Sequence, residues 1–357
     1  MVPSASDLLR ALVRIPSLSR EEGPAADFVS ETAQRHRLKT WRLDENVVVE
    51  LGEGDDVLLL NSHLDVVPPS EGMPHGAFDG YEDDGVLWGR GTVDAKASGA
   101  AMLAALLRLK AENFAPRNGR VLLALTACEE TGGPYNGLEA LRPHLPPLAG
   151  ALVGEPTELH PCLAQKGMLQ LRVEAHGRTA HAARAHLGEN AVFKMARALT
   201  VLEGLRFERE DLYLGRPTLT VTTITGGTAR NVVPDRCEAI LDVRSVPVYT
   251  HDELLEEVRR AVPEVSVEIR SGRFVPCRTD PDSRIARAVA QAHPAGVPFG
   301  SPTASDWVFL RDVPTVKMGP GPSERSHTPE ERIELRKVER SAEVYAAVAR
   351  AFFAGCC

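Results

Sequence analysis

Short apolar runs and helix-like patterns follow one another along the first part of the chain. Segments 6–15 and 21–35 repeat apolar residues at the spacing of amphipathic helices, whereas 46–51 and 57–60 are apolar runs typical of strands. The run at 57–60, Val-Leu-Leu-Leu, lies between polar residues, which predicts a strand buried on both faces inside a parallel sheet. Open sheets of this kind carry their chemistry at the carboxyl ends of the strands. The residues that follow these strands are therefore the first candidates for a functional site.

The pattern changes in the middle of the chain. Before residue 166 and after residue 275 it predicts further buried strands at 120–126 and 148–153 and helices at 97–109 and 334–353. Between them it predicts strands at 169–175, 219–225, 238–243 and 265–269 and helices at 190–205 and 251–262. This βαββαβ order is typical of a ferredoxin-like sandwich. We predict an α/β domain with a mixed, mainly parallel sheet over 1–165 and 276–357, and an inserted α+β domain over 166–275.

Composition narrows the chemistry. A chain of 357 residues with 43% hydrophobic content is long for one domain, and its net charge of -8 argues against nucleic-acid binding. The six cysteines form no Cys-x-x-Cys pair, so any metal would be held by histidine and carboxylates. No apolar run approaches the roughly 18 residues of a membrane span, and the first residues lack the pattern of a signal peptide. We expect a cytoplasmic protein that acts on small molecules, peptides or proteins.

Metal-binding residue types follow three of the predicted strands. His63 and Asp65 end the first, Glu129 and Glu130 follow the strand at 120–126, and Glu155 follows the strand at 148–153. Taken singly, His63 is also compatible with a structural histidine, and the glutamate pair with an ordinary surface pair. Because three strands end this way, we favour a common site.

Three further features have alternative interpretations. Asp94 precedes the helix at 97–109, where it could be an N-cap or a metal ligand. The segment 176–186 contains His176, Arg178, His181, Arg184 and His186, which composition alone would make a solvated basic turn. Arg244 could bind a carboxylate with two hydrogen bonds or form a structural ion pair with Asp242.

Five ordered motifs carry a resemblance to a known family. They are His63-Leu64-Asp65, Gly91-Thr92-Val93-Asp94-Ala95-Lys96, Glu129-Glu130, Gly154-Glu155-Pro156-Thr157 and Gly319-Pro320-Gly321 with His327-Thr328-Pro329-Glu330-Glu331. Together they resemble the acetylornithine deacetylase, succinyl-diaminopimelate desuccinylase and aminoacylase family over essentially the whole chain. The resemblance implies a zinc-aminopeptidase-like metal domain and an inserted lid domain that forms a homodimer. It also implies an amidohydrolase with two divalent metals, zinc or cobalt.

The resemblance implies a role for each residue of the predicted metal site. His63 and Glu155 would hold one metal, Glu130 and His327 the other, Asp94 would bridge both, and Asp65 would orient His63. The ligand types suit zinc or cobalt, and a bridging carboxylate suits the short intermetal distance of about 3.5–4 Å in two-metal hydrolases. A histidine ligand also needs an acceptor on its other nitrogen, which Asp65 can provide. Glu129 is left without a metal and is our candidate for the general base.

The resemblance also implies residues that contact the substrate. His181 would reach the partner subunit's active site and stabilise the oxyanion, while Asn231 and Arg244 would lie near the substrate. Thr303 belongs to the segment Gly300-Ser301-Pro302-Thr303-Ala304-Ser305-Asp306, which resembles a loop that lines the family's substrate pocket. Pro302 and Ala304 depart from the family's usual sequence there.

The segment 319–333 looks most like hydrolases that release lysine or ornithine from an amino-group carrier protein in lysine and arginine biosynthesis. The carrier is a small acidic protein, so we expect a basic surface near the site, and Arg178 and Arg184 are candidates for it. The alternatives are an N-acetylornithine or N-acetyl-lysine deacetylase, and a metal-binding dimer without catalysis.

Overall fold

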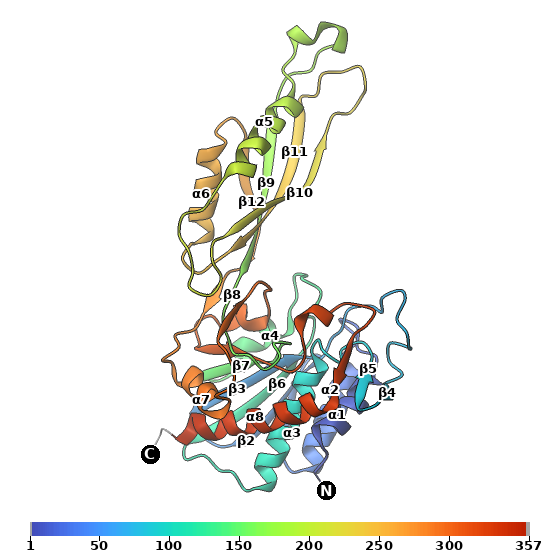
Figure 1. Cartoon of the computed structure of the whole chain (residues 1–357), viewed down its shortest axis with the longest axis vertical. Helices are drawn as coiled ribbons and strands as arrows, with labels where there is room; N and C mark the ends of the chain where they lie inside the picture. Colours follow the sequence, from blue (N-terminus) through green and yellow to red (C-terminus); the bar gives the residue numbers. More distant parts are fainter. Residues whose placement is uncertain (1, 355–357) are drawn as a thin grey trace. The chain divides into compact units, whose positions relative to one another are not determined.

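The computed structural model describes residues 2–354 and divides the chain into two compact units, each built around its own sheet (Figure 1). Unit 1 comprises Met1–Leu163, Thr279–Phe299 and Ser305–Cys357, and unit 2 comprises Ala164–Arg278 and Gly300–Ala304. The two main boundaries lie two and three residues from those drawn on the sequence, at 165/166 and 275/276. Segment 300–304, which we had placed with the metal domain, belongs to unit 2, where Lys166 N donates to Ser301 O at 3.0 Å.

The large sheet has a parallel centre and antiparallel edges, as the sequence predicted. Its order is β1-β2-β6-β3-β7-β15-β8-β13, and β14 pairs with β8. Strand β3 runs parallel to both β6 and β7, and β15 runs parallel to β7. The strands are β1 Lys39–Leu43, β2 Asn46–Gly52, β3 Asp56–His63, β6 Gly119–Thr126, β7 Gly150–Val153, β8 Cys162–Gln165, β13 Cys277–Arg278, β14 Phe299–Ser301 and β15 Thr315–Lys317.

Helices cover this sheet and bury its central strand. The helices of unit 1 are α1 Ala5–Val13, α2 Gly23–Arg35, α3 Lys96–Ala111, α4 Gly137–Leu141, α7 Arg284–Ala292 and α8 Leu335–Ala354. Helices α1, α3, α7 and α8 pack beside one another in one layer (Figure 1). Every residue of β3 after Asp56 is buried, as expected for a strand with neighbours on both edges and cover on both faces. None of the helices in residues 2–354 is long and apolar enough to cross a membrane.

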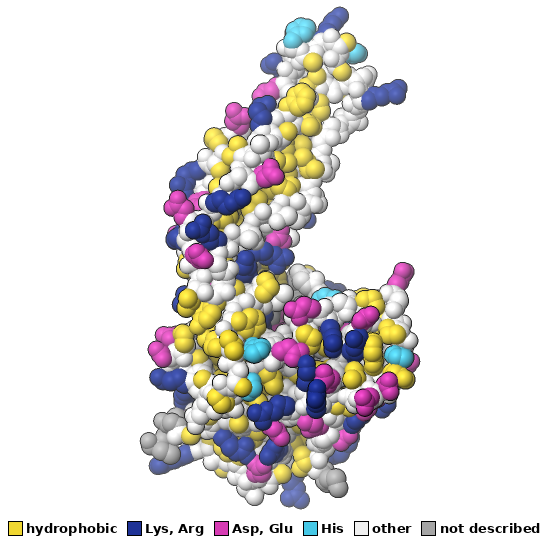
Figure 2. Space-filling model, viewed as in Figure 1, with side chains coloured by type: hydrophobic (Ala, Val, Ile, Leu, Met, Phe, Trp, Pro, Cys, Tyr) yellow, Lys and Arg dark blue, Asp and Glu magenta, His cyan; other side chains and the backbone are white. Residues whose placement is uncertain are grey.

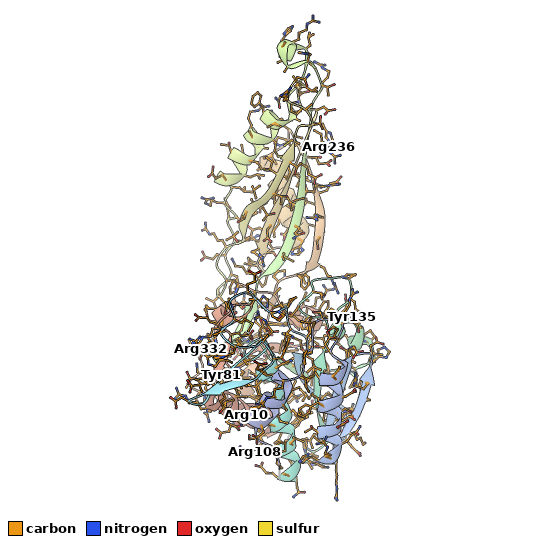
Figure 3. All side chains as sticks on the ribbon, turned by 90° about the vertical axis from the view of Figure 1, so that its right-hand side faces the viewer. Arg10, Tyr81, Arg108, Tyr135, Arg236 and Arg332 are labelled. Carbon is orange, nitrogen blue, oxygen red and sulfur yellow. The ribbon has the colours of Figure 1, made fainter. Side chains whose placement is uncertain are left out.

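A small antiparallel sheet in unit 1 was not predicted, because its strands of three residues are too short to show a period. It consists of β4 Tyr81–Asp83, β5 Val86–Trp88 and β16 Arg332–Glu334 in the order β16-β5-β4. The register places Arg332 opposite Trp88, and the Arg332 guanidinium lies 4.3 Å from the centre of the Trp88 ring. Tyr81 and Arg332, labelled in Figure 3, mark this sheet. It joins a segment near residue 90 to one near residue 331.

Unit 2 has the predicted ferredoxin-like fold. Its strands are β9 Gly167–His176, β10 Thr218–Gly226, β11 Arg236–Ser245 and β12 Ser266–Phe274, and its helices are α5 Ala191–Gly204 and α6 His251–Ala261. The sheet order is β10-β11-β9-β12, and each neighbouring pair is antiparallel. Along β9 buried and half-buried residues alternate, so one face packs on the helices and the other is partly exposed.

Candidate active site

The topology of the large sheet brings three sets of polar residues together. Strands β6, β3 and β7 are adjacent and parallel, so their carboxyl ends lie at one edge. His63 is the last residue of β3, Glu129 and Glu130 follow β6, and Glu155 follows β7. Close packing brings in the later segment, since a Cβ on Gly319 would lie only 2.6 Å from Glu155 O.

Asp94 lies between two imidazoles at the centre of this cluster. Its Oδ1 is 3.1 Å from His63 Nε2, and its Oδ2 is 3.4 Å from His327 Nε2. On the first side Glu155 Oε1 lies 3.9 Å from His63 Nε2, and on the second Glu130 Oε2 lies 2.9 Å from His327 Nε2. The structure therefore groups His63 with Glu155 and His327 with Glu130, with Asp94 shared.

Asp94 is not the N-cap of the following helix. Helix α3 begins at Lys96 with Ala95 as its N-cap, and no side chain accepts a capping hydrogen bond there. The interpretation of Asp94 as a plain cap is thus wrong. Its carboxylate faces the two histidines instead.

Asp65 organises the site in two ways. His63 Nδ1 is 2.9 Å from the backbone oxygen of Asp65 and 3.4 Å from its Oδ1, so residue 65 orients the imidazole mainly through its backbone. The carboxylate also accepts from Glu129 N at 3.1 Å and from Glu130 N at 3.0 Å. Ser19 Oγ donates to it at 2.7 Å. Asp65 therefore fixes the turn that presents both glutamates, a role that we did not predict.

The carboxylates of the cluster differ in how far the two histidines compensate their negative charge. Burial raises the pKa of Glu129 well above its usual range, an effect that His63 opposes and Glu155 reinforces. Burial, together with Asp94, raises the pKa of Glu155 to about 8. For Asp94 burial acts in the same direction, but hydrogen bonds with His327 and His63 outweigh it and lower the pKa. Hydrogen bonds with Asp94 and Glu130 raise the pKa of His327 to about 10. Carboxylates crowded in this way favour a bound cation.

The residues present fit a divalent metal. Ligand atoms of His63, Asp94 and Glu130 all lie within 4.8 Å of one another. Glu155 Oε1 is buried and has no hydrogen-bond partner among the described atoms, although a buried carboxylate oxygen normally has one. Imidazole nitrogen and carboxylate oxygen are donors suited to zinc and related ions.

Asp306 is a further buried acid near the cluster, and the sequence indicates it only as part of the segment 300–306. It accepts from Asn136 Nδ2 at 2.7 Å and from Thr126 Oγ1 at 3.0 Å. Burial raises its pKa to about 6. Because the Asp306 charge also raises the pKa of Glu129 and Glu155, it adds to the negative potential of the site.

The substrate-contacting residues predicted by resemblance lie in unit 2 and are more exposed. His181, Arg178 and Asn231 are exposed, and Figure 2 shows histidine and basic side chains gathered at one end of this unit. His181 Nδ1 accepts from Ala183 N at 3.1 Å, and Arg178 Nε donates to Leu187 O at 3.1 Å. Arg244 Nε donates to Asp242 Oδ1 at 2.8 Å, which is the structural ion pair considered above. Thr303 is exposed, and its Oγ1 lies 2.9 Å from Ser301 Oγ.

Comparison with known proteins agrees with this fold and site. The family model described as Peptidase family M20/M25/M40 matches residues 59–351. A succinyl-diaminopimelate desuccinylase from Methylorubrum extorquens is 30% identical over 97% of this chain and 98% of its own length. A probable carboxypeptidase from Aspergillus fumigatus is 35% identical over 74% of this chain and 67% of its own length.

Solved structures share the fold. The aminopeptidase PepT from Bacillus cereus superimposes with a TM-score of 0.80 at 21% identity, covering 96% of both chains. A dinuclear metal binding peptidase of the M20 family from Bacillus subtilis gives 0.74 at 15% identity, covering 97% of this chain and 96% of its own.

The large sheet, the candidate active site and the related proteins together identify a metal-dependent hydrolase that acts on amide bonds. The chain belongs to the M20/M25/M40 peptidase family.

Proposed function

We propose that the chain binds two divalent metals, zinc or cobalt, and hydrolyses a linear amide. His63 and Glu155 hold one metal, His327 and Glu130 hold the other, and Asp94 is shared. The observation that carries this proposal is that the two oxygens of Asp94 face two different imidazoles, at 3.1 and 3.4 Å. The Bacillus subtilis relative, described as dinuclear, supports the same stoichiometry.

Glu129 is the proton carrier in this proposal. Bound metals of this kind polarise a carbonyl and lower the pKa of water. Glu129 precedes the ligand Glu130, and within residues 2–354 no hydrogen bond joins its carboxylate to an imidazole, although the charge of His63 acts on it. The carboxylate is thus available to accept a proton from water and return it to the leaving amine. The backbone N–H of Glu129 donates to Asp65 Oδ1 at 3.1 Å, and this hydrogen bond fixes the backbone from which the Glu129 side chain extends.

The finer proposal concerns the acyl group. The desuccinylase relatives are named for a succinyl group, and the resemblance of segment 319–333 implies a γ-glutamyl group at the end of an acidic carrier protein. Both acyl groups carry a carboxylate of their own, whereas an acetyl group does not. We therefore favour an amide whose acyl part is acidic, with carrier-linked lysine or ornithine first and an N-succinyl amino acid second.

The basic end of unit 2 supports a carrier protein as substrate. Arg178, Arg184, His176 and His186 are exposed there, and complementary charge accelerates the encounter with an acidic protein. A homodimer, in which His181 serves the partner subunit, belongs to the same proposal. N-acetylornithine or N-acetyl-lysine deacetylation is the alternative.

Two experiments test these proposals. Dialysis against a chelator should abolish hydrolysis, and zinc or cobalt should restore it; full activity of metal-free protein would contradict the metal-dependent proposal. Metal binding without hydrolysis of any amide would favour the metal-binding dimer without catalysis. A substrate panel should then give the highest kcat/KM with carrier-linked lysine or ornithine, a lower value with N-succinyl-diaminopimelate and the lowest with N-acetylornithine. Equal or better turnover of N-acetylornithine would favour the deacetylase.

Charge reversal separates the carrier from the small substrates. Arg178→Glu with Arg184→Glu should lower kcat/KM for the carrier more than for N-succinyl-diaminopimelate, because only the carrier has an extended acidic surface. The matched control is Arg197→Glu with Arg260→Glu, which makes the same change of charge on the exposed sides of α5 and α6. An equal effect of both pairs would contradict carrier docking at residues 176–186.

A further inference from the structure

A buried ion pair lies beside Asp94, the central residue of the candidate metal site. Arg90 Nη1 donates to Glu331 Oε2 at 2.6 Å, and each residue is only 1% exposed. The small sheet brings them together, because its register sets Arg332 opposite Trp88 and Gly89 N donates to Glu331 O at 3.2 Å. Neither residue has a role in the chemistry proposed above.

Glu331 holds the backbone of the shared ligand. Its Oε1 accepts from Val93 N at 2.9 Å and from Asp94 N at 3.2 Å. The other oxygen, Oε2, is the one that faces Arg90. A single carboxylate thus connects the guanidinium to the residue whose side chain lies between the two imidazoles.

Arg90 connects the same point to the segment of His327. Its Nη1 also donates to Thr328 O at 3.4 Å, and its Nη2 donates to Ser70 Oγ at 2.6 Å. Ser70 Oγ in turn donates to His327 O at 3.2 Å. The His327 side chain is 51% exposed, so packing holds it only in part, and these backbone contacts add to its own contacts with Asp94 and Glu130.

Stability alone is a weak reason for such a pair. The free energy needed to remove two charges from water is about as large as the free energy gained from their attraction. Apolar residues of similar size often stabilise a protein core equally well. Partners behind metal ligands, in contrast, commonly change metal affinity about 10–100-fold.

We infer that Arg90 and Glu331 are positioning residues that set the distance between Asp94 and His327 and thereby the affinity of the metal held by His327 and Glu130. The inference rests on the proposed two-metal site and extends it to a frame of three segments, near residues 70, 90 and 330. His63 ends β3 and Glu155 follows β7 in the large sheet, and His63 meets this frame at Asp94, whose Oδ1 lies 3.1 Å from His63 Nε2.

The test is a calorimetric titration of metal-free full-length protein with zinc, supported by the absorption spectrum of the cobalt form. Glu130→Gln identifies the binding step of the metal held with His327. In Glu331→Gln this step should weaken about 10–100-fold, and the cobalt spectrum of that site should change, while the other step, which shares only Asp94 with it, should weaken less. Ser70→Ala, a half-buried position where folding is less at risk, should weaken the same step to a smaller extent.

The matched control is Arg284→Met. Arg284 Nη1 donates to Asp56 Oδ2 at 2.9 Å at the start of β3, the end of the strand opposite His63, so this variant breaks an arginine–carboxylate pair away from the site. It should leave both metal steps unchanged. Wild-type affinity at both steps in Glu331→Gln and Ser70→Ala, or an equal loss in Arg284→Met, would overturn the inference. Wild-type protein that binds no metal would instead overturn the proposed function.

Discussion

The two regions that carry candidate functional residues differ in what holds their side chains. In unit 1, His63 and Asp65 are buried and each makes contacts with several segments of the chain. In unit 2, His181 and Arg178 are exposed and bond mainly to the backbone of residues close in sequence. A buried site is pre-organised and feels charge strongly, whereas exposed charges are screened by water. The buried cluster of unit 1 therefore suits chemistry, whereas the exposed residues of unit 2 suit contact with a substrate, and His181 is the one among them that we propose to act in the reaction itself.

The largest effect is expected from the proposed base. Glu129→Gln should lower kcat about 10²–10⁴-fold, because the amide cannot accept the proton, while metal content stays near that of the wild type. The control is Glu324→Gln, which removes a carboxylate at an exposed position of unit 1 and should leave kcat unchanged. Loss of metal from Glu129→Gln would mean that the roles of Glu129 and Glu130 are exchanged.

A somewhat smaller effect is expected in unit 2. If His181 supplies a hydrogen bond to the oxyanion, His181→Ala should lower kcat about 10²–10³-fold. His186→Ala, at another exposed position of the same short helix, should have little effect.

Mixing chains tests whether His181 acts on the partner subunit. Heterodimers of His181→Ala and Glu129→Gln chains should recover activity if one intact site can form from two chains. Absence of recovery after confirmed subunit exchange would place His181 in its own chain's site or outside catalysis.

Sequence patterns predicted the parts of the fold that are long or repeated. Helix α8 and strand β9 extend over enough residues to show a period, and helix α3 is a long apolar run. Strands β4, β5 and β16 are too short for that, and helix α7 was missed as well.

The site was predictable where residues of one chemical type follow successive strands, as with His63, Glu130 and Glu155. The contacts that hold these residues in place could not be predicted from the sequence. From the sequence, Asp94 could be either a helix N-cap or a metal ligand, because only the fold brings two histidines to it. Likewise Arg90 and Glu331 are 241 residues apart, and no local pattern indicates their pairing.

The smallest effect expected is on the stability of unit 2. His251 is partly buried against Ser245, with Nε2 2.9 Å from Oγ, and burial lowers its pKa below the usual 6.5. The unfolded chain therefore binds the proton more readily than the folded one, so this contribution to stability is complete above the unfolded pKa and is lost as pH falls through it. The protection factors of the β11 amides, which are corrected for the intrinsic pH dependence of exchange, should therefore fall as the pH is lowered from about 7 to about 5.

His251→Asn should weaken this pH dependence, while His176→Asn, which changes an exposed histidine of unit 2, should leave it as in the wild type. Identical pH profiles for wild type and His251→Asn would contradict the assignment.

The central claim is that Asp94 is shared by two metals, and metal stoichiometry tests it most directly. Wild-type protein loaded with zinc and freed of excess should contain two metals per chain. Glu155→Gln and Glu130→Gln should each retain one, and Asp94→Asn should retain little of either, because its side chain faces both His63 and His327. One metal in the wild type, or two in Asp94→Asn, would contradict the account.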